Sequence, residues 1–317
     1  MSNRPGAHRL PSPSFDAHLR TTAATRPGGI VTLSRRAVVT LSCPDTAGIV
    51  HAVSGFLVDR GLTIVQSQQF GDPISGRFFL RLEFTAEDGS PLDLVAFRRD
   101  FAAVALRFAL EWRLADAAER TRTVLMVSKF AHCLNDLLFR TSIGELNLDV
   151  VAVVSNHPDL GHLADSFDVP FKHIPVTHAT KADAEAALVR LVQEENVDLV
   201  VLARYMQILS DDLCKHLDGK AINIHHSMLP SFKGAKPYHQ AHARGVKVIG
   251  ATAHYVTADL DEGPIIDQEL IRVDHSLTPD QLAARGREAE TRALARAVRC
   301  HTENRVIVDG GRTVVFQ

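Results

Sequence analysis

The pattern of apolar and polar positions divides the chain into two folded parts. A β-rich run begins after Arg36 and is followed by apolar residues at helical spacing from Ile49 to Leu57. Two further strands are expected over 62–70 and 77–84, then a helix over 92–110 and a closing strand near Trp112. This βαββαβ order predicts an α+β, ferredoxin-like unit with its helices on one face of an antiparallel sheet.

Local signals refine the first helix of this unit. Asp45 is expected to cap its amino end, and Gly61 to supply the left-handed residue that ends it. The unit is assigned to residues 36–115, and a polar segment at 116–121 is interpreted as a linker. Residues 1–35 contain several prolines and no periodicity, so a disordered tail is expected there.

The second part, residues 122–317, alternates short apolar runs with helical stretches. The runs lie at 124–127, 150–154, 199–203 and 221–224, and a typical helical stretch is 182–194. Such runs are typical of buried strands in a parallel sheet, so we expect a Rossmann-like α/β domain with a mostly parallel sheet. Ser128-Lys129-Phe130 follows the first strand where a dinucleotide fold carries glycines, and no P-loop is found. No nicotinamide, flavin or other cofactor is therefore expected.

Composition and charge limit the function classes. The chain of 317 residues is 45% hydrophobic and 23% charged, with a formal net charge of −2, so it has no global attraction for nucleic acid or for an anionic membrane. Its four cysteines lie far apart, which favours a reducing compartment, the cytoplasm, without disulfides. No apolar run reaches the length of a membrane span.

The most informative segment for chemistry begins on the strand at 221–224. Asn223 and His225 are two residues apart and therefore share one face of that strand, at a carboxyl end where α/β sheets place ligands. Downstream, 255–264 is an acidic turn that contains Asp261. An amide, an imidazole and a carboxylate brought together can polarise a carbonyl group and activate water. Taken alone, the acidic turn is better interpreted as a solvated loop. The Asn-x-His segment upstream reverses this interpretation for Asp261, but not for Glu262.

The polar residues also allow two other interpretations. Five histidines close in sequence suggest a metal site. However, His225 and His226 are expected to face opposite ways and the sequence has no metal-ligand motif, so no metal is expected. Cys133 next to His132 suggests a nucleophile with its base, but adjacent residues on a helix do not face each other. Cys133 is more typical of a small buried residue, and both are assigned to the lining of the pocket. The histidine set is His225, His226, His239, His242 and His254.

The residues of these segments carry a resemblance. Asn223-Ile224-His225 with Ser227, Leu229-Pro230 and the run from Leu260 to Pro264 resemble the formyltransferase-fold family that handles 10-formyltetrahydrofolate. Within it, the stretches 232–235, 237–241 and 250–255 are similar to those of the formyltetrahydrofolate deformylases. The resemblance covers about residues 36–317, and the N-terminal unit resembles an ACT domain.

The resemblance implies site residues. The family's catalytic Asn, His and Asp fall on Asn223, His225 and Asp261. Our hypothesis is that Asp261 positions and deprotonates water, while Asn223 and protonated His225 stabilise the oxyanion and His225 passes a proton to N10. The family's folate-binding stretch falls on Met206, Gln207, Ile208 and Leu209, with Thr257, Ala258, Asp259 and Leu260 opposite, and the expected pocket lining also includes Ser128, Lys129, His132, Cys133 and Gly234.

The resemblance also implies an activity and partners. Transferases of the family that formylate an amino sugar phosphate have a glycine-containing loop where this chain has Ser128-Lys129, so water is the expected nucleophile. The implied reaction is hydrolysis of 10-formyltetrahydrofolate, which supplies formate for purine biosynthesis and balances the one-carbon pool. Methionine and glycine are the implied effectors, near Asp45 and Gly48, in a homo-oligomer such as a tetramer. A formyltransferase to an amine and a catalytically dead folate or amino-acid sensor stay open as alternatives.

Overall fold

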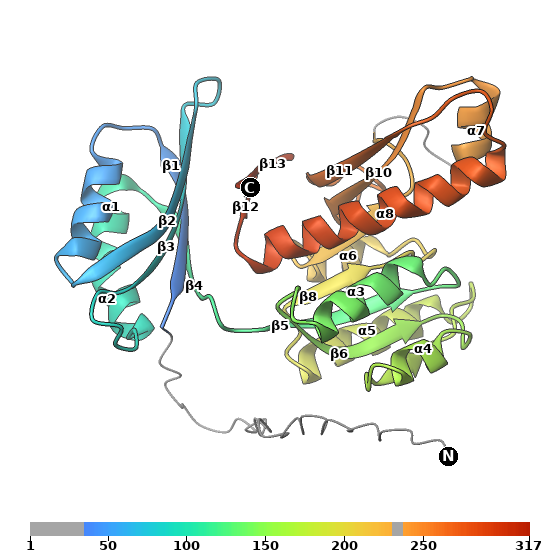
Figure 1. Cartoon of the computed structure of the whole chain (residues 1–317). Coiled ribbons are helices and arrows are strands. Elements are labelled where there is room, and N and C mark those ends of the chain that lie inside the picture. The colour runs from blue at the N-terminus through green and yellow to red at the C-terminus, as the bar shows by residue number, and fades with distance from the viewer. Residues whose placement is uncertain (1–34, 230–236) are drawn as a thin grey trace, which may run out of the picture. The chain divides into compact units, whose positions relative to one another are not determined.

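The computed structural model describes residues 35–229 and 237–317 (Figure 1). The tail expected over 1–35 lies outside the described residues except for its last position, and so does Gly234 of the expected pocket. Among the described residues, no helix combines the length and apolar character needed to cross a bilayer. All four cysteines lie in the described residues as free thiols.

The N-terminal unit is a four-stranded antiparallel sheet with the strand order β2-β3-β1-β4. Its elements follow one another as βαββαβ, the order that the sequence predicts. Inward-facing side chains of the sheet and the helices form one core, in which the rings of Phe56, Phe97 and Phe101 pack together. The elements are β1 (Ala37–Pro44), α1 (Ile49–Val58), β2 (Leu62–Asp72), β3 (Arg77–Ala86), α2 (Leu94–Phe108) and β4 (Glu111–Asp116).

The amino end of α1 corrects one expectation. The N-cap is Gly48, whose φ of 95° is left-handed, and no side chain caps the helix. Asp45 lies three residues before it, where its backbone N–H donates to the carbonyl of Gly76. The Asp45 cap predicted from sequence is therefore wrong, because the turn after β1 continues and the N-cap lies three residues later. In contrast, Asp93 caps α2 through its side chain.

The C-terminal unit contains a seven-stranded sheet with the order β11-β10-β9-β8-β5-β6-β7. Strands β5 to β9 are parallel, and β10 pairs antiparallel with both β9 and β11, so the sheet is mostly parallel. Its elements are β5 (Thr121–Val127), α3 (His132–Ser142), β6 (Leu148–Ser155), α4 (Gly161–Asp165), β7 (Phe171–His173), α5 (Lys181–Glu194), β8 (Leu199–Leu202), α6 (Asp211–His216), β9 (Ala221–His225), α7 (Pro237–Ala243), β10 (Val248–Tyr255), β11 (Ile265–Arg272) and α8 (Pro279–Thr302). A two-stranded sheet of β12 (Val306–Asp309) and β13 (Arg312–Val315) follows.

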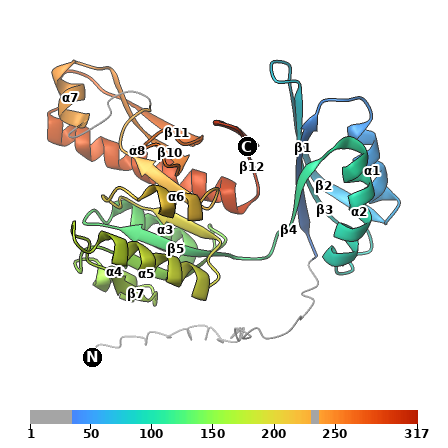
Figure 2. The same cartoon turned by 180° about the vertical axis from the view of Figure 1, so that it is seen from behind.

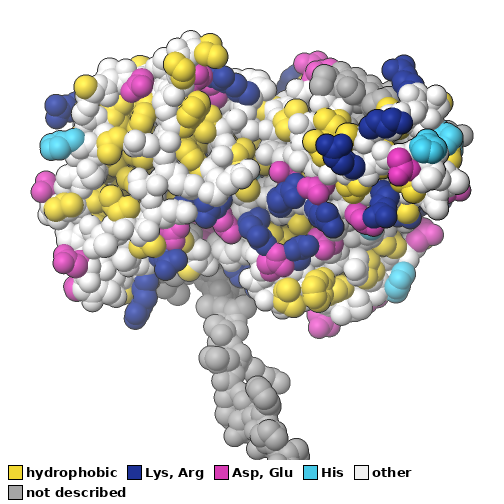
Figure 3. Space-filling model, turned by 45° about the horizontal axis from the view of Figure 1, so that its top comes forward, with side chains coloured by type: hydrophobic (Ala, Val, Ile, Leu, Met, Phe, Trp, Pro, Cys, Tyr) yellow, Lys and Arg dark blue, Asp and Glu magenta, His cyan; other side chains and the backbone are white. Residues whose placement is uncertain are grey.

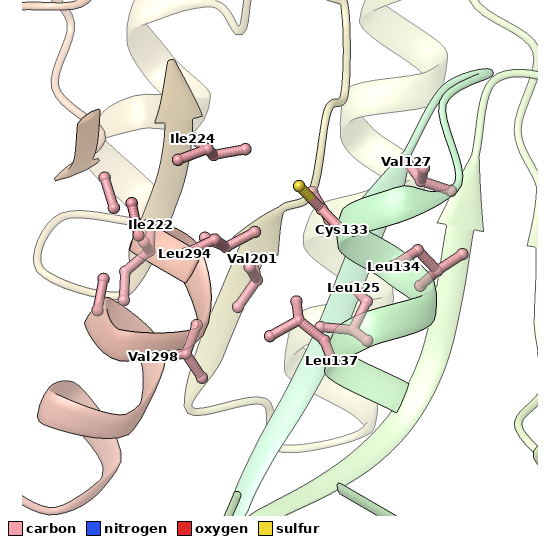
Figure 4. Close-up of a cluster of buried hydrophobic side chains, with 14 of the residues drawn as sticks. Leu125, Val127, Cys133, Leu134, Leu137, Val201, Ile222, Ile224, Leu294 and Val298 are labelled. Carbon is pink, nitrogen blue, oxygen red and sulfur yellow. The ribbon is translucent and has the colours of Figure 1, made fainter. Parts of the chain in front are cut away.

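Both faces of the large sheet are buried, as expected for parallel strands. Along β5, Leu125 and Val127 point into one core with α3 and α8, whereas Val124 and Met126 point into a second core with α5 and α6. Figure 4 shows the first core, in which Cys133 of α3 lies among these apolar side chains. Figure 2, seen from behind, brings α5 forward.

Helix α8 has clear amino-terminal signals and two different faces. Thr278 and Gln281 form a reciprocal capping box, and Pro279 stands at its first position. Its exposed face forms ion pairs with β11, such as Arg296 with Asp267 and Arg292 with Glu269.

Acidic and basic side chains are interspersed on the molecular face shown in Figure 3, so that face has no patch of one charge.

Candidate active site

The topology of the large sheet places a pocket at its carboxyl edge. From the interior strand β5 the chain runs outward through β6 and β7, then returns to β8 on the other side of β5. At such a reversal the loops after neighbouring strands diverge and leave a crevice. A pocket of about 510 Å³ lies at this edge, lined by residues from the segments 202–209, 223–226 and 254–261.

Asn223 is oriented by a histidine on the next strand. In the antiparallel pairing of β9 with β10, Asn223 is the Cα partner of His254. Asn223 Nδ2 lies 3.2 Å from His254 Nε2, and His254 Nδ1 lies 2.8 Å from the carbonyl oxygen of Tyr255. Since a carbonyl only accepts, Nδ1 carries the proton, and burial holds the pKa of His254 below its usual value so that the ring is neutral. Nε2 therefore accepts from the Asn223 amide, whose second N–H is left for a ligand in the pocket.

His225 and Asp261 form a second pair. His225 Nδ1 lies 3.2 Å from Asp261 Oδ2, and both side chains are largely buried. Burial is the largest influence on the pKa of Asp261 and raises it, but the hydrogen bond from His225 and the nearby imidazoles together lower the pKa below its ordinary value. The carboxylate is thus ionised and accepts from Nδ1. His225 Nε2 is buried without a hydrogen-bond partner among the described residues, so it is available to a bound molecule.

The loop that carries Asp261 is tightly folded. Asp261 adopts a left-handed backbone with φ of 58°, which is rare for a residue with a side chain. Gly263 passes so close to β10 that a Cβ atom there would lie 1.8 Å from the Tyr255 carbonyl oxygen. The Tyr255 N–H in turn donates to the carbonyl of Pro264 at 2.9 Å. These contacts hold the carboxylate against His225.

His226 corrects a second expectation. Strand β9 ends at His225, so the strand rule that alternate residues face opposite sides no longer applies to His226. The two imidazole rings instead stack, with centroids 5.0 Å apart and an interplanar angle of 26°. Burial, followed by the positive charge of Arg204, lowers the pKa of His226 to about 4. His226 therefore lines the pocket as an uncharged imidazole at pH 7.

The structure brings most of the predicted folate-binding residues to the same pocket. Met206 and Ile208 are 51% and 62% exposed, so their apolar side chains are free to contact a ring system. Asp259 is not among the residues that line the pocket. The predicted residues that do line it are Met206, Gln207, Ile208, Leu209, Thr257, Ala258 and Leu260.

The predicted lining residues after β5 lie elsewhere. Ser128, Lys129, His132 and Cys133 are not among the residues that line the pocket with Asn223. Ser128 is buried and acts indirectly, since its hydroxyl donates to Asn156 Oδ1 at 2.6 Å and accepts from the Met206 N–H at 2.9 Å. Lys129 is exposed. Cys133 is a core residue whose pKa is raised by burial, which suits an inert thiol.

Sequence reasoning missed a buried polar network beside the pocket. Glu290 of α8 is 1% exposed and accepts hydrogen bonds from Tyr238 Oη and His132 Nε2, both at 2.8 Å. Arg204, after β8, places its Nε 3.3 Å from Glu290 Oε2. The sequence does contain a local signal for this network. Glu290 is an acidic residue in the buried stripe of α8, together with Ala293, Leu294 and Ala297, and a carboxylate is rarely buried unless it is paired.

Three groups of this network meet the distance criteria for a metal site. The ligand atoms of His132, Cys133 and Glu290 lie within 4.8 Å of one another. However, both oxygens of Glu290 already accept hydrogen bonds, and the Arg204 guanidinium supplies the positive charge that compensates it. Burial also raises the pKa of the Cys133 thiol, which disfavours the thiolate that a metal needs. The set is therefore interpreted as a hydrogen-bond and ion-pair network.

Comparison with known proteins agrees with this geometry. The model of the formyl transferase family matches residues 121–298. The formyltetrahydrofolate deformylase of Corynebacterium sp. (strain P-1) is 54% identical over 282 residues, which cover 89% of this chain and 98% of that protein. The crystal structure of a formyltetrahydrofolate deformylase from Burkholderia mallei is 53% identical with a TM-score of 0.85, over 89% of this chain and 100% of that chain.

A transferase of the same fold matches a smaller share of the chain. Glycinamide ribonucleotide transformylase 1 from Symbiobacterium toebii is 31% identical with a TM-score of 0.59, over 63% of this chain and 95% of that chain. The deformylases thus account for more of the chain, at higher identity. The chain belongs to the formyl transferase family and, within it, to the formyltetrahydrofolate deformylases.

Proposed function

We propose that the chain hydrolyses 10-formyltetrahydrofolate to formate and tetrahydrofolate in the pocket at the carboxyl edge of the large sheet. The observation that carries the proposal is the convergence of Asn223, His225 and Asp261 on that pocket, where the buried His225 Nε2 has no hydrogen-bond partner within 35–229 and 237–317. The family membership supports the same activity, since relatives that cover nearly the whole chain are formyltetrahydrofolate deformylases.

The substrate would occupy the pocket in two parts. The pterin ring is placed against the segment from Met206 to Leu209, where backbone groups and exposed apolar side chains border the pocket. Thr257, Ala258 and Leu260 border the other side. The formyl group on N10 then lies toward His225, where its oxygen would accept the free N–H of Asn223.

The chemical step would use the remaining polar groups. Asp261, ionised and fixed by His225, holds a water molecule and takes its proton as the oxygen attacks the formyl carbon. Asn223 and protonated His225 donate to the oxyanion of the tetrahedral intermediate. His225 Nε2 then gives a proton to N10 as the C–N bond breaks. One C–O bond forms and one C–N bond breaks, which gives formic acid. Asp261 then loses the proton that it took and His225 regains one, so the net release is the single proton that formic acid loses as it becomes formate.

The test is an assay without an acceptor. Enzyme and 10-formyltetrahydrofolate are incubated alone, and formate and tetrahydrofolate are both measured. Equal amounts of the two products support hydrolysis. Product formation only after an amine is added would instead support a formyltransferase, the first alternative. Tight folate binding without turnover would support a sensor with a dead active site. Formate made in this reaction would serve purine biosynthesis and balance the one-carbon pool.

We further propose that the N-terminal unit is an ACT domain that senses free amino acids and pairs in a homo-oligomer such as a tetramer. Its antiparallel βαββαβ topology supports this assignment. Asp45 and Gly48 flank the turn between β1 and α1, where methionine or glycine would bind. The four free thiols favour the reducing cytoplasm as the compartment of the protein.

The effector proposal is tested by adding free amino acids. Methionine and glycine should each change the turnover rate or the melting temperature, while alanine should not, and Asp45→Ala should abolish the response. Identical curves with and without the effectors would remove this proposal.

A further inference from the structure

The proposed hydrolysis changes the charge of the group in the pocket, and this inference rests on that function. A formyl amide is neutral, but the formate produced from it is an anion. It leaves beside Asp261, whose low pKa returns it to the ionised carboxylate after the chemical step, and this carboxylate repels the anion. An anion in a partly buried site is stable only where a cation or several hydrogen-bond donors compensate it. The pocket therefore needs a positive group away from Asp261.

Arg204 is the permanent cation of this pocket. Among the described residues that line it, Arg204 is the only lysine or arginine. The two other imidazoles that line it next to His225 are neutral at physiological pH, since burial lowers the pKa values of both His226 and His254. The charge of Arg204 also reaches His226, since it is one of the causes of the low pKa of that ring.

An ion pair with Glu290 holds the guanidinium in place. The Arg204 side chain is 10% exposed, and its Nε lies 3.3 Å from Glu290 Oε2. That nitrogen makes no hydrogen bond to a described residue, so its contact with Glu290 is an ion pair that lies off the hydrogen-bonding direction. The two oxygens of Glu290 are taken by Tyr238 and His132. Phe130 supports the guanidinium, with its ring centroid 5.5 Å from Cζ.

The backbone of Arg204 is strained in a way that directs this side chain. Its φ of 67° lies in the left-handed region, which is unfavourable for a residue with a side chain and persists where the surroundings enforce it. Ser128 enforces it from both sides, since its N–H donates to the Arg204 carbonyl at 3.1 Å and its hydroxyl accepts from the Met206 N–H. Strain of this kind is concentrated at functional sites.

Tyr238, which donates a hydrogen bond to Glu290, packs closely against α8. Tyr238 lies over α8 at Gly286, where a Cβ atom would come within 1.9 Å of its hydroxyl oxygen. Glu290 follows one helical turn later and accepts the hydrogen bond of that hydroxyl. A glycine at this position of the helix thus lets the network close over Glu290.

We propose that Arg204 forms a carboxylate subsite that receives formate as it leaves the formyl carbon. Glu290, with Tyr238 and His132 on its two oxygens, compensates the buried guanidinium and holds it in place, while the terminal N–H groups of Arg204 bind the formate oxygens. Arg204 is thus a product-binding residue, and Glu290 is a positioning residue that acts through it.

Product inhibition tests the proposal. Initial rates of tetrahydrofolate release are measured at rising sodium formate, with sodium chloride at the same ionic strength as the reference. The test variant carries both Arg204→Met and Glu290→Gln, so that no buried carboxylate is left without its cation. Formate should inhibit the native enzyme more than chloride does, and the inhibition constant should rise about tenfold to hundredfold in the double variant, as expected for loss of charge-assisted hydrogen bonds. The kcat/KM for the folate substrate, which precedes formate release, should change less.

Matched variants complete the test. Arg292→Gln removes an exposed arginine of α8 that pairs with Glu269, and should leave formate inhibition unchanged. Arg204→Lys keeps the charge but loses the planar fork, so it should weaken formate inhibition severalfold and decides the question if the double variant does not fold. Inhibition by formate that equals that of chloride, or that is the same in native and Arg204 variants, overturns the subsite. If the native enzyme releases no formate at all, the proposed function itself fails.

Discussion

Asn223 and His254 face each other across β9 and β10, and the amide nitrogen of Asn223 lies 3.2 Å from Nε2 of His254. The carbonyl of Tyr255 fixes the tautomer of His254, and this tautomer fixes which end of the amide points into the pocket. The backbone pairing of two strands thus determines the direction of the N–H group that the proposed oxyanion site requires.

The first prediction concerns His254. His254→Leu should lower kcat about tenfold to hundredfold with little change in KM, because the Asn223 amide loses the acceptor that orients it. His254→Gln should recover much of the loss, since its amide oxygen can accept the same hydrogen bond. Steady-state kinetics of the three proteins checks this. Equal damage by both substitutions would indicate that His254 only fills space.

The oxyanion donor itself gives a second prediction. Asn223→Ala should lower kcat about a hundredfold or more, as loss of one such donor does elsewhere, while the protein stays folded. Asn147→Ala, which removes an exposed amide that bonds to the Glu119 carbonyl, serves as the control. Turnover and thermal melting are measured for both. Near-normal turnover of Asn223→Ala contradicts the assignment.

Gly263 gives a third prediction, at a distance from the reacting atoms. Gly263→Ala places a Cβ atom 1.8 Å from the Tyr255 carbonyl oxygen, so the loop must move and take Asp261 with it. We expect a loss of about 1–3 kcal/mol in unfolding free energy and a large fall in kcat. Gly311→Ala is the matched control, because nothing lies within 4 Å of its added Cβ. Wild-type kinetics for Gly263→Ala would show that the loop does not position the carboxylate.

The pH dependence of stability follows from His226. Its pKa is about 4 in the folded chain, mainly because it is buried, against 6.5 for an exposed histidine. Between these values the unfolded chain binds more protons, so the stabilisation is complete above pH 6.5 and is lost as the pH falls toward 4. The difference amounts to about 3 kcal/mol at most. Urea unfolding at pH 7.5 and at pH 4.5 should show a smaller loss for His226→Gln than for the native chain. Equal losses would show that His226 is not the group responsible.

The parts of the site that were predictable depend on contacts close in sequence. Asn223 and His225 share a face because a strand repeats every two residues, which is a local rule. The rule failed one residue later, at His226, because β9 ends at His225 and the backbone turns. The Asp45 cap failed in a similar way, since polarity before an apolar helix does not fix the residue at which the helix begins.

The remaining features depend on contacts between distant segments. Nothing near His254 indicates that the register of β10 places it opposite Asn223. Arg204 and Glu290 meet only because the loop after β8 and the buried face of α8 converge on one edge of the sheet. The order of strands and helices was accessible from hydrophobic periodicity, whereas the pairing of β10 and β11 as antiparallel strands required the structure.

The most direct measurement follows the oxygen atom of water. A single turnover of 10-formyltetrahydrofolate is run in ¹⁸O-labelled water without an amine acceptor, for the native enzyme and for Asp261→Asn. Native enzyme should release formate that contains one oxygen from water, and Asp261→Asn should release it at least about a hundredfold more slowly, because its amide cannot take the proton. Unlabelled formate, or an unchanged rate in Asp261→Asn, would contradict water activation by this site.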